Sequence, residues 1–273
     1  MEEKILIFDF GSQYTQLIAR RIRELNIYCE IFPFNKIPEI TPEYVGVILS
    51  GSPFSVHDKD SPEINFETFG NLPVLGICYG AQLIAKENDC VVSKSEIREY
   101  GRAKLSYVNS ESLLMKDVEL DSDVWMSHGD SITEITESFQ VLASTKDVKV
   151  TSYYFKQKNY YGLQFHPEVT HTAFGREILD NFTVKICGCS QSWNPKRFVE
   201  YTIEQIRDTV KDDKVVLGLS GGVDSSVAAM LIHKAIGKNL FCVFVDNGLL
   251  RKNEFSTVLS SYKNLGLNVI GVD

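Results

Sequence analysis

The sequence predicts an α/β protein of two domains, in which strands and helices alternate along the chain. Apolar runs alternate with amphipathic helical patterns over residues 4–88 and again over 197–272. Such alternation implies parallel strands in a sheet covered by helices on both faces. Residues 101–164 differ, because short alternating runs joined by polar turns are typical of antiparallel strands. A chain of 273 residues is long enough for two such cores.

The first elements follow directly from the apolar pattern. Residues 4–9 form an apolar run closed by Gly11, which predicts a buried strand. Ser12 is expected to cap the next helix, whose apolar residues from Tyr14 to Leu25 share one face, and Asn26 is expected to end it. Further strands are expected at 28–34, 46–49 and 73–77, with a helix at 79–88.

A polar stretch that ends in proline marks the expected domain boundary. The first domain is expected to close with a helix over 174–186, and the polar segment Ser190 to Pro195 follows it. We therefore expect a first domain at residues 1–190, a linker at 191–196 and a second domain at 197–273.

The second domain repeats the alternation on a smaller scale. Pro195 suits the first turn of a helix that runs to about residue 210. Strands are expected at 214–219, 240–245 and 267–272, with helices at 225–236 and 254–264. Three strands make a small, exposed half-sheet, so this domain is expected to be incomplete.

Composition disfavours several classes of protein. A formal net charge of −8 disfavours sequence-independent nucleic-acid binding, which depends on basic surface. The N-terminus lacks the pattern of a signal peptide, and no apolar run reaches the ~20 residues that span a bilayer. We expect a cytoplasmic protein that binds neither membrane nor nucleic acid. The six cysteines are scattered, and Cys187-Gly188-Cys189 has no second pair at zinc spacing, so neither disulfides nor zinc is expected.

A glycine-flanked cysteine is the first candidate site. Gly76-Ile77-Cys78-Tyr79-Gly80 lies where an apolar strand meets a helix. A nucleophile at the tip of such a turn needs small neighbours, and the amide of the next residue, Tyr79, can donate to a developing oxyanion. The helix N-terminus would also favour a thiolate. The alternative is an ordinary buried cysteine in a core strand.

A histidine and a glutamate two residues apart supply the expected partners of the cysteine. In Phe165-His166-Pro167-Glu168-Val169, extended backbone would point His166 and Glu168 the same way. Pro167 cannot donate a sheet hydrogen bond, which places the pair at a strand end. A cysteine nucleophile needs a histidine base, and that base needs an acceptor to orient it. The alternative is an accidental surface pair.

Together these motifs resemble the class I (triad) glutamine amidotransferases, and in detail the glutamine-hydrolysing GMP synthase family. The resemblance implies that Cys78 is the nucleophile, His166 the base and later acid, and Glu168 the orienting carboxylate. It extends through the first domain over residues 9–16, 49–51, 76–80, 125–130 and 164–172.

The same resemblance implies a set of substrate contacts. The backbone amides of Ser52 and Tyr79 would form the oxyanion hole. The residues expected to contact glutamine are Gly51, Gln82, Ser127, His128, Gly129 and Asp130. Ser52 replaces the family's usual second glycine, so its amide can serve only if its φ angle suits a residue with a Cβ. Phe54 stands where glutamate is common, and Ala81 where methionine is usual.

A second glycine-containing loop predicts a phosphate site. Ser220-Gly221-Gly222-Val223-Asp224-Ser225-Ser226 follows an apolar strand and precedes a helix, so its amides can face one anion. It lacks the Gly-Lys-Ser/Thr ending of a Walker loop. It resembles the pyrophosphate loop of ATP pyrophosphatases, which implies ATP binding by Ser220, Gly221, Gly222, Val223, Asp224, Ser225 and Ser226, with Mg²⁺ on Asp224. The alternative is a turn that merely caps a helix. Residues 241–251 also match the GMP synthase family, and this resemblance implies that the adenine lies against the end of the strand expected at 240–245, at Val245.

The resemblance implies a two-step chemistry. Glutamine would be hydrolysed at Cys78, and the ammonia would serve ATP-dependent amination of XMP to GMP in a full-length homodimer. No cofactor is expected for the glutaminase step, and this chain alone is expected to lack synthase activity. The alternatives are another amidotransferase coupled to an ATP pyrophosphatase, a non-catalytic remnant, and a thiol hydrolase of the α/β-hydrolase type. The last is disfavoured because those folds place the acid far from the histidine.

Overall fold

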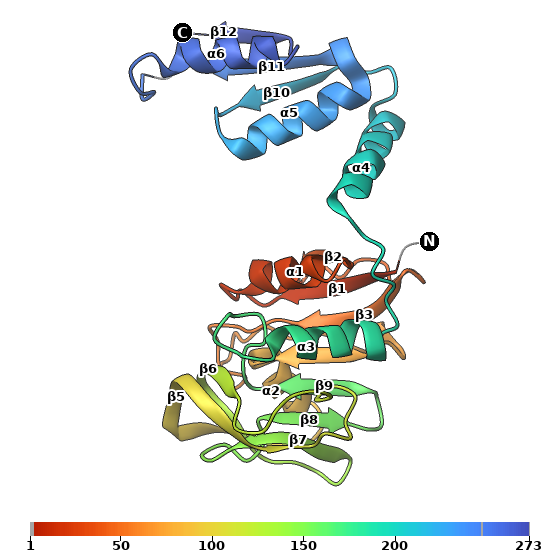
Figure 1. Cartoon of the computed structure of the whole chain (residues 1–273), viewed down its shortest axis with the longest axis vertical. Coiled ribbons are helices and arrows are strands. Elements are labelled where there is room, and N and C mark those ends of the chain that lie inside the picture. The colour runs from red at the N-terminus through yellow and green to blue at the C-terminus, as the bar shows by residue number, and fades with distance from the viewer. Residues whose placement is uncertain (1–2, 247, 273) are drawn as a thin grey trace. The chain divides into compact units, whose positions relative to one another are not determined.

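The structure is a computed structural model that describes residues 3–246 and 248–272, without the side chains of 95–99. The chain divides into two compact units, Met1–Trp193 and Asn194–Asp273, whose elements are labelled in Figure 1. The division falls within the expected linker at 191–196. The functions expected of the domains at 1–190 and 197–273 stay predictions. Residues 1, 2, 247 and 273, which the expected domains or motifs included, lie outside the described residues.

Unit 1 is built on a nine-stranded mixed sheet in the order β2-β1-β3-β4-β9-β8-β7-β5-β6. The strands from β2 to β9 in this order are parallel, and the rest pair antiparallel. The strands are β1 (Lys4–Asp9), β2 (Tyr28–Pro33), β3 (Tyr44–Leu49), β4 (Val74–Ile77), β5 (Val91–Val108), β6 (Asp123–Glu134), β7 (Phe139–Thr145), β8 (Ser152–Phe155) and β9 (Tyr160–Leu163).

Two apolar cores lie on opposite faces of this sheet. Alternate residues of β1 divide between them, because successive side chains of a strand point to opposite faces. Ile5 and Ile7 pack in the core that includes residues of α1 (Thr15–Glu24) and α3 (Gly175–Asp180). Leu6 and Phe8 pack in the core that includes α2 (Tyr79–Lys86) and Phe69 of the short helix η1 (Phe66–Phe69). Helices therefore cover both faces, which confirms the expected three-layer α/β/α arrangement.

The cap of one helix and the hydrogen-bond register of another differ from the expectation. Helix α1 begins at Thr15 with Tyr14 as its N-cap, and Ser12 does not cap it; the Ser12 hydroxyl instead accepts the Tyr14 amide N–H at 3.1 Å, within the preceding turn. The last helix of unit 1 changes to a π-helix, η2 (Asn181–Ile186), where the Cys187 amide bonds to the Phe182 carbonyl five residues back. Apolar periodicity does not distinguish these hydrogen-bond registers.

Unit 2 is a three-stranded parallel sheet in the order β10-β11-β12. Its elements are α4 (Pro195–Val210), β10 (Val215–Leu219), α5 (Val223–Ile236), η3 (Gly237–Asn239), β11 (Leu240–Val245), α6 (Glu254–Asn264) and β12 (Val269–Val272). Its core joins Leu219, Ala229, Phe244 and Tyr262. Within the described residues, no helix is both long and apolar enough to cross a membrane.

Candidate active site

Cys78 sits in a strained turn between β4 and α2. Its φ of 53° and ψ of −105° lie in a region that residues with a Cβ rarely adopt. The Cys78 amide donates to the Leu163 carbonyl of β9 at 2.7 Å, which ties this turn to the neighbouring strand. The sheet therefore holds the thiol at the carboxyl ends of β4 and β9, where loops gather side chains.

The two glycines of the motif are required by close packing of the backbone. A Cβ on Gly76 would lie 2.5 Å from the Gly80 carbonyl, and a Cβ on Gly80 would lie 2.6 Å from the Leu49 carbonyl oxygen. Neither glycine has a positive φ. Both are therefore needed because the first turn of α2 packs directly on β3 and β4, which is a more specific reason than the tightness of the turn.

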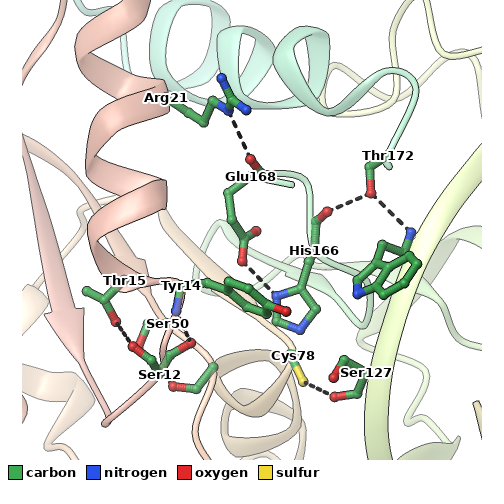
Figure 2. A network of polar contacts seen from close by, with 12 residues as sticks. Ser12, Tyr14, Thr15, Arg21, Ser50, Cys78, Ser127, His166, Glu168 and Thr172 are labelled. Carbon is green, nitrogen blue, oxygen red and sulfur yellow. Dashed lines mark hydrogen bonds and ion pairs between the residues drawn. The ribbon is translucent and has the colours of Figure 1, made fainter. Parts of the chain in front are cut away.

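His166 and Glu168 meet in a turn that follows β9. The expected extended backbone at this pair is wrong, because Pro167 and Glu168 lie in a turn, and the Thr172 hydroxyl donates to the His166 carbonyl at 2.6 Å. The His166 amide also donates to the Trp125 carbonyl of β6 at 3.0 Å. The side chains still meet, with 2.7 Å between His166 Nδ1 and Glu168 Oε1 (Figure 2). Both residues are buried.

The carboxylate fixes the proton arrangement of the imidazole. Glu168 accepts the hydrogen bond of Nδ1, which leaves Nε2 of His166 as the nitrogen that can take up a proton. Burial lowers the pKa of His166, but the charge of Glu168 and the sulfur of Cys78 raise it well above its ordinary value. The backbone of Glu168 is held by Arg21 of α1, whose Nε donates to the Glu168 carbonyl at 2.9 Å.

The sulfur of Cys78 lies on the opposite side of the imidazole from Glu168, as Figure 2 shows. Its thiol donates to the Ser127 carbonyl of β6 at 3.7 Å. A Cβ on Gly51 would lie 3.5 Å from His166 Cε1 and 3.8 Å from Cys78 Cβ, so Gly51 borders both side chains. The ring of Tyr14 stands edge-on to the imidazole at 5.1 Å between centroids. Cys78, His166 and Glu168 thus form one continuous arrangement.

A cavity of about 640 Å³ opens at this arrangement. Every residue expected to contact glutamine or form the oxyanion hole lines it, whereas Glu168 lies behind His166. The expected residues that line it are Gly51, Ser52, Cys78, Tyr79, Gln82, Ser127, His128, Gly129, Asp130 and His166. The β5–β6 hairpin supplies the stretch from Ser127 to Asp130 and pairs Lys94 with Asp130 across its strands. The structure therefore brings these expected residues together from four separate segments of the chain.

The two expected oxyanion donors have usable backbones. Ser52 has no positive φ, so the serine that replaces glycine is accommodated without strain. Tyr79 is the first residue of α2, and the amides of the first helical turn have no partner within their helix. In the part of the chain that the structure describes, neither amide donates to a protein acceptor. Phe54 lines the mouth of the cavity, and Ala81 is fully buried.

The side-chain amide of Gln82 makes hydrogen bonds within the protein. Its Nε2 donates to the Asp130 carbonyl at 2.8 Å and to Gln164 Oε1 at 3.3 Å, so both N–H groups of the amide have partners within the protein. Burial, followed by the charge of His166, lowers the pKa of His128, although the Asp130 carbonyl opposes this through a hydrogen bond to Nδ1 at 2.8 Å. Burial therefore disfavours the charged form of His128.

Sequence reasoning missed three neighbours of the reacting groups. Gln164 donates through Nε2 to Cys78 Sγ at 4.0 Å, Tyr14 packs on the imidazole, and Arg21 holds the Glu168 backbone. Gln164 and Tyr14 lie inside recognised motifs, but no pattern of spacing could have paired them with Cys78 or His166. Arg21 sits on the charged side of α1, where the sequence pattern indicates an ordinary solvated residue.

The second candidate site lies in unit 2, between β10 and α5. Gly221 has a φ of 79°, and Gly222 precedes the first turn of the 14-residue helix α5. The loop hydroxyls bond to each other and to the loop backbone: Ser220 Oγ lies 3.0 Å from Ser225 Oγ, and Ser226 donates to the Gly222 carbonyl at 2.7 Å. Such a loop at a helix N-terminus suits an anion.

The residues present fit a magnesium ion that is shared with a phosphate. Among the described residues, no three acidic, histidine or cysteine side chains gather to hold a metal by themselves. Asp224 is exposed in the first turn of α5, and Mg²⁺ commonly takes only one or two carboxylates together with phosphate oxygens. Val245 is exposed at the end of β11.

The mixed α/β sheet and its thiol site define the class of protein. Residues 6–186 match the family described as glutamine amidotransferase class-I. The chain belongs to that family. Residues 197–273 match a second family, described as NAD synthase. Both expected folds are therefore confirmed, the second as an NAD synthase-like domain.

Curated relatives indicate a narrower group of proteins to which the chain is similar. The chain is 61% identical over its whole length to a "GMP synthase [glutamine-hydrolyzing]" of Cytophaga hutchinsonii, of which it covers 54%. It is 56% identical to the protein of the same description in Phocaeicola vulgatus, of which it covers 53%. The chain thus spans about half the length of the curated relatives it matches.

Solved structures agree on the fold of unit 1. A putative GMP synthase subunit from Thermoplasma acidophilum is 30% identical, with a TM-score of 0.57 over 98% of that chain and 74% of this one. A glutamine amidotransferase from Thermotoga maritima is 17% identical, with a TM-score of 0.51 over 99% of that chain and 85% of this one, and it shows likeness of fold alone.

Proposed function

We propose that unit 1 hydrolyses glutamine to glutamate and ammonia at Cys78, His166 and Glu168. The observation that carries the proposal is the order of these groups: a sulfur on one side of a buried imidazole and a carboxylate 2.7 Å from Nδ1 on the other. This order lets His166 accept the thiol proton through Nε2 while Glu168 stabilises the imidazolium. A strained turn at Cys78 presents the sulfur to the cavity.

The first half of the reaction forms a thioester. The Cys78 sulfur attacks the γ-amide carbon of glutamine, and the carbonyl oxygen becomes an oxyanion that the amides of Ser52 and Tyr79 can stabilise. His166 returns its proton to the departing nitrogen, and ammonia leaves. In the second half, His166 takes a proton from water, and the hydroxide attacks the thioester. The Cys78 sulfur recovers the proton, and glutamate is released.

Two charges of the cavity suit the remainder of the substrate. Glutamine carries an α-ammonium and an α-carboxylate, and among the described residues the lining of the cavity contains one carboxyl side chain, Asp130, and one lysine, Lys94. Gln82 presents its oxygen as a further acceptor for the ammonium. Buried acceptors of this kind reject analogues that lack the matching donor.

For the whole protein we propose GMP synthase activity. Its substrates would be glutamine, ATP and XMP, and the ammonia released at Cys78 would replace the oxygen that ATP has activated on XMP. The relatives' description and the NAD synthase-like unit 2 support this proposal. In unit 2, the loop from Ser220 to Ser226 would hold the phosphates, Asp224 would hold Mg²⁺ and Val245 would border the adenine. We also propose that the full-length protein is a homodimer.

A glutaminase assay tests the proposal for unit 1. Glutamate release from glutamine is expected with the wild-type chain and is expected to disappear in Cys78→Ala and His166→Ala. Cys90→Ala is the matched control, because Cys90 is a buried cysteine outside the cavity and its loss should leave the rate unchanged. Equal glutamate release by Cys78→Ala and wild type would exclude the proposed nucleophile.

A related enzyme with another ATP-dependent substrate is the second candidate, because the family matched by unit 2 is described as NAD synthase. The test is whether XMP stimulates the release of AMP and pyrophosphate by the full-length protein. Stimulation by a different acceptor, with none by XMP, would favour the second candidate.

A further inference from the structure

We infer that Gln164 is a further catalytic residue, which holds the Cys78 thiolate through its side-chain amide. The inference rests on the proposed role of Cys78 as nucleophile. Gln164 lies on the turn between β9 and His166, and only 1% of it is exposed. Its Nε2 points to Cys78 Sγ at 4.0 Å, within the range of a weak hydrogen bond to sulfur. Catalytic hydrogen bonds are often long before substrate binds and shorten afterwards.

A chain of amides fixes the direction of this donor. Gln82 donates through Nε2 to Gln164 Oε1 at 3.3 Å and to the Asp130 carbonyl at 2.8 Å. With its oxygen engaged by a donor, the Gln164 amide is oriented with its nitrogen toward the sulfur. The backbone of Gln164 is also held, because its N–H donates to the Thr151 carbonyl at 2.8 Å. Gln164 can therefore offer a fixed donor at little cost in side-chain entropy.

The sulfur has two different polar neighbours, which suit its two protonation states. The neutral thiol donates to the Ser127 carbonyl at 3.7 Å, and that oxygen would repel a thiolate. When the thiol proton moves to Nε2 of His166, the bond to Ser127 is lost and the N–H of Gln164 becomes the favourable partner. A donor to a thiolate stabilises the charged form and lowers the thiol pKa.

This role differs from that of a merely structural amide. A structural Gln164 would satisfy the Gln82 amide and affect the free energy of unfolding only. A Gln164 that holds the thiolate would also set the pH at which Cys78 becomes reactive. The measurement is therefore the pH profile of alkylation of Cys78 by iodoacetamide in the whole chain, read by mass spectrometry of the peptide that contains Cys78.

We expect Gln164→Met to move this profile upward by about half to one pH unit, because loss of a donor disfavours the thiolate. At pH values below the midpoint of the wild-type profile the alkylation rate would fall roughly 3- to 10-fold, in proportion to the thiolate population. Gln164→Glu should move the profile further, since a carboxylate beside the sulfur adds like-charge repulsion. Gln140→Met, the same change at an exposed position of β7, is the matched control and should leave the profile unchanged.

The outcomes separate this inference from the proposed function. A profile of Gln164→Met within about 0.2 pH unit of the wild type, while Cys78 is still alkylated, would overturn the inference and leave the nucleophile intact. Glutaminase activity that survives Cys78→Ala would overturn the proposed function itself. Should Gln164→Met unfold, Gln164→Asn shortens the side chain by one carbon and withdraws the amide from the 4.0 Å contact with the sulfur, so an unchanged Cys78 profile there would equally overturn the inference.

Discussion

At the scale of single residues, the reactivity of this site depends on how three side chains share one proton. His166 stands between the Cys78 sulfur and the Glu168 carboxylate, and its pKa is raised well above the ordinary value although burial opposes this. A raised pKa makes the imidazole a stronger base toward the thiol and favours the charged pair. The direction of the shift follows from the buried carboxylate 2.7 Å from Nδ1.

Glu168→Gln is expected to lower the pKa of His166 and slow glutamine hydrolysis by about 10²-fold or more, because the amide carries no charge to stabilise the imidazolium. The His166 titration can be followed by NMR of its ring nitrogens, and the rate by glutamate release. An unchanged titration in Glu168→Gln would contradict the assigned pairing.

The raised pKa also links His166 to stability. Protonated His166 stabilises the fold below its ordinary pKa of about 6.5, and this contribution is lost as the pH rises through the higher folded value. We therefore expect the free energy of unfolding of the wild type to fall with rising pH above neutrality, and His166→Gln to remove this part of the dependence. Urea titrations at several pH values measure it. If the free energy of unfolding of His166→Gln depended on pH more steeply than that of the wild type, the result would contradict this link between His166 and stability.

The residue scale also shows what could be predicted from sequence. Cys78, His166 and Glu168 could be paired because each lies in a motif with a chemical rationale. The Ser127 carbonyl and the Gln164 amide could not be paired with the sulfur, because their distances depend on how the β5–β6 hairpin packs beside β9. The fit of Ser52 could not be predicted either, because its φ angle is set by the fold.

At the scale of elements, the site exists because α2 packs unusually close to β3. Alternation of apolar residues was enough to place β1–β4, α1 and α2 within a residue or two of their actual ends. It did not predict the π-helix η2, whose different register leaves the apolar pattern unchanged. It also did not predict the turn after His166, across which the Thr172 hydroxyl donates to the His166 carbonyl.

Gly80→Ala tests the contact between α2 and β3. The new Cβ would lie 2.6 Å from the Leu49 carbonyl oxygen, so the helix must shift away from the sheet. We expect a loss of about 1–3 kcal/mol in the free energy of unfolding of unit 1, together with a fall in glutaminase rate as Cys78 moves. Gly218→Ala in β10 is the control, because a Cβ there meets no atom within 4 Å. Unaltered stability in Gly80→Ala would refute the steric account.

At the scale of the whole molecule, the chain joins a glutamine amidotransferase to an NAD synthase-like unit. The acidic composition disfavours sequence-independent nucleic-acid binding, which stays a prediction, and the two loops could be found from their glycines. The arrangement of the two units could not be derived, because nothing in either motif describes a contact between them. The curated relatives are nearly twice as long as this chain.

We expect these 273 residues alone to form no GMP from XMP, ATP and glutamine, because they cover only about half of each relative. Hydrolysis of glutamine would be retained at a reduced rate. The measurement is chromatography of nucleotides after incubation of the purified chain with all three substrates. Formation of GMP at a rate that scales with the concentration of this chain would contradict the division of labour proposed here.

The most direct test of the central claim is covalent labelling of the whole chain by an electrophilic glutamine analogue such as a diazoketone or chloroketone. The account predicts a single adduct on the peptide containing Cys78, prevented by an excess of glutamine and slowed in His166→Ala. The other five cysteines should stay unlabelled, because they lie outside the cavity. Labelling that spreads over those cysteines, or that proceeds equally fast without the imidazole, would contradict the account.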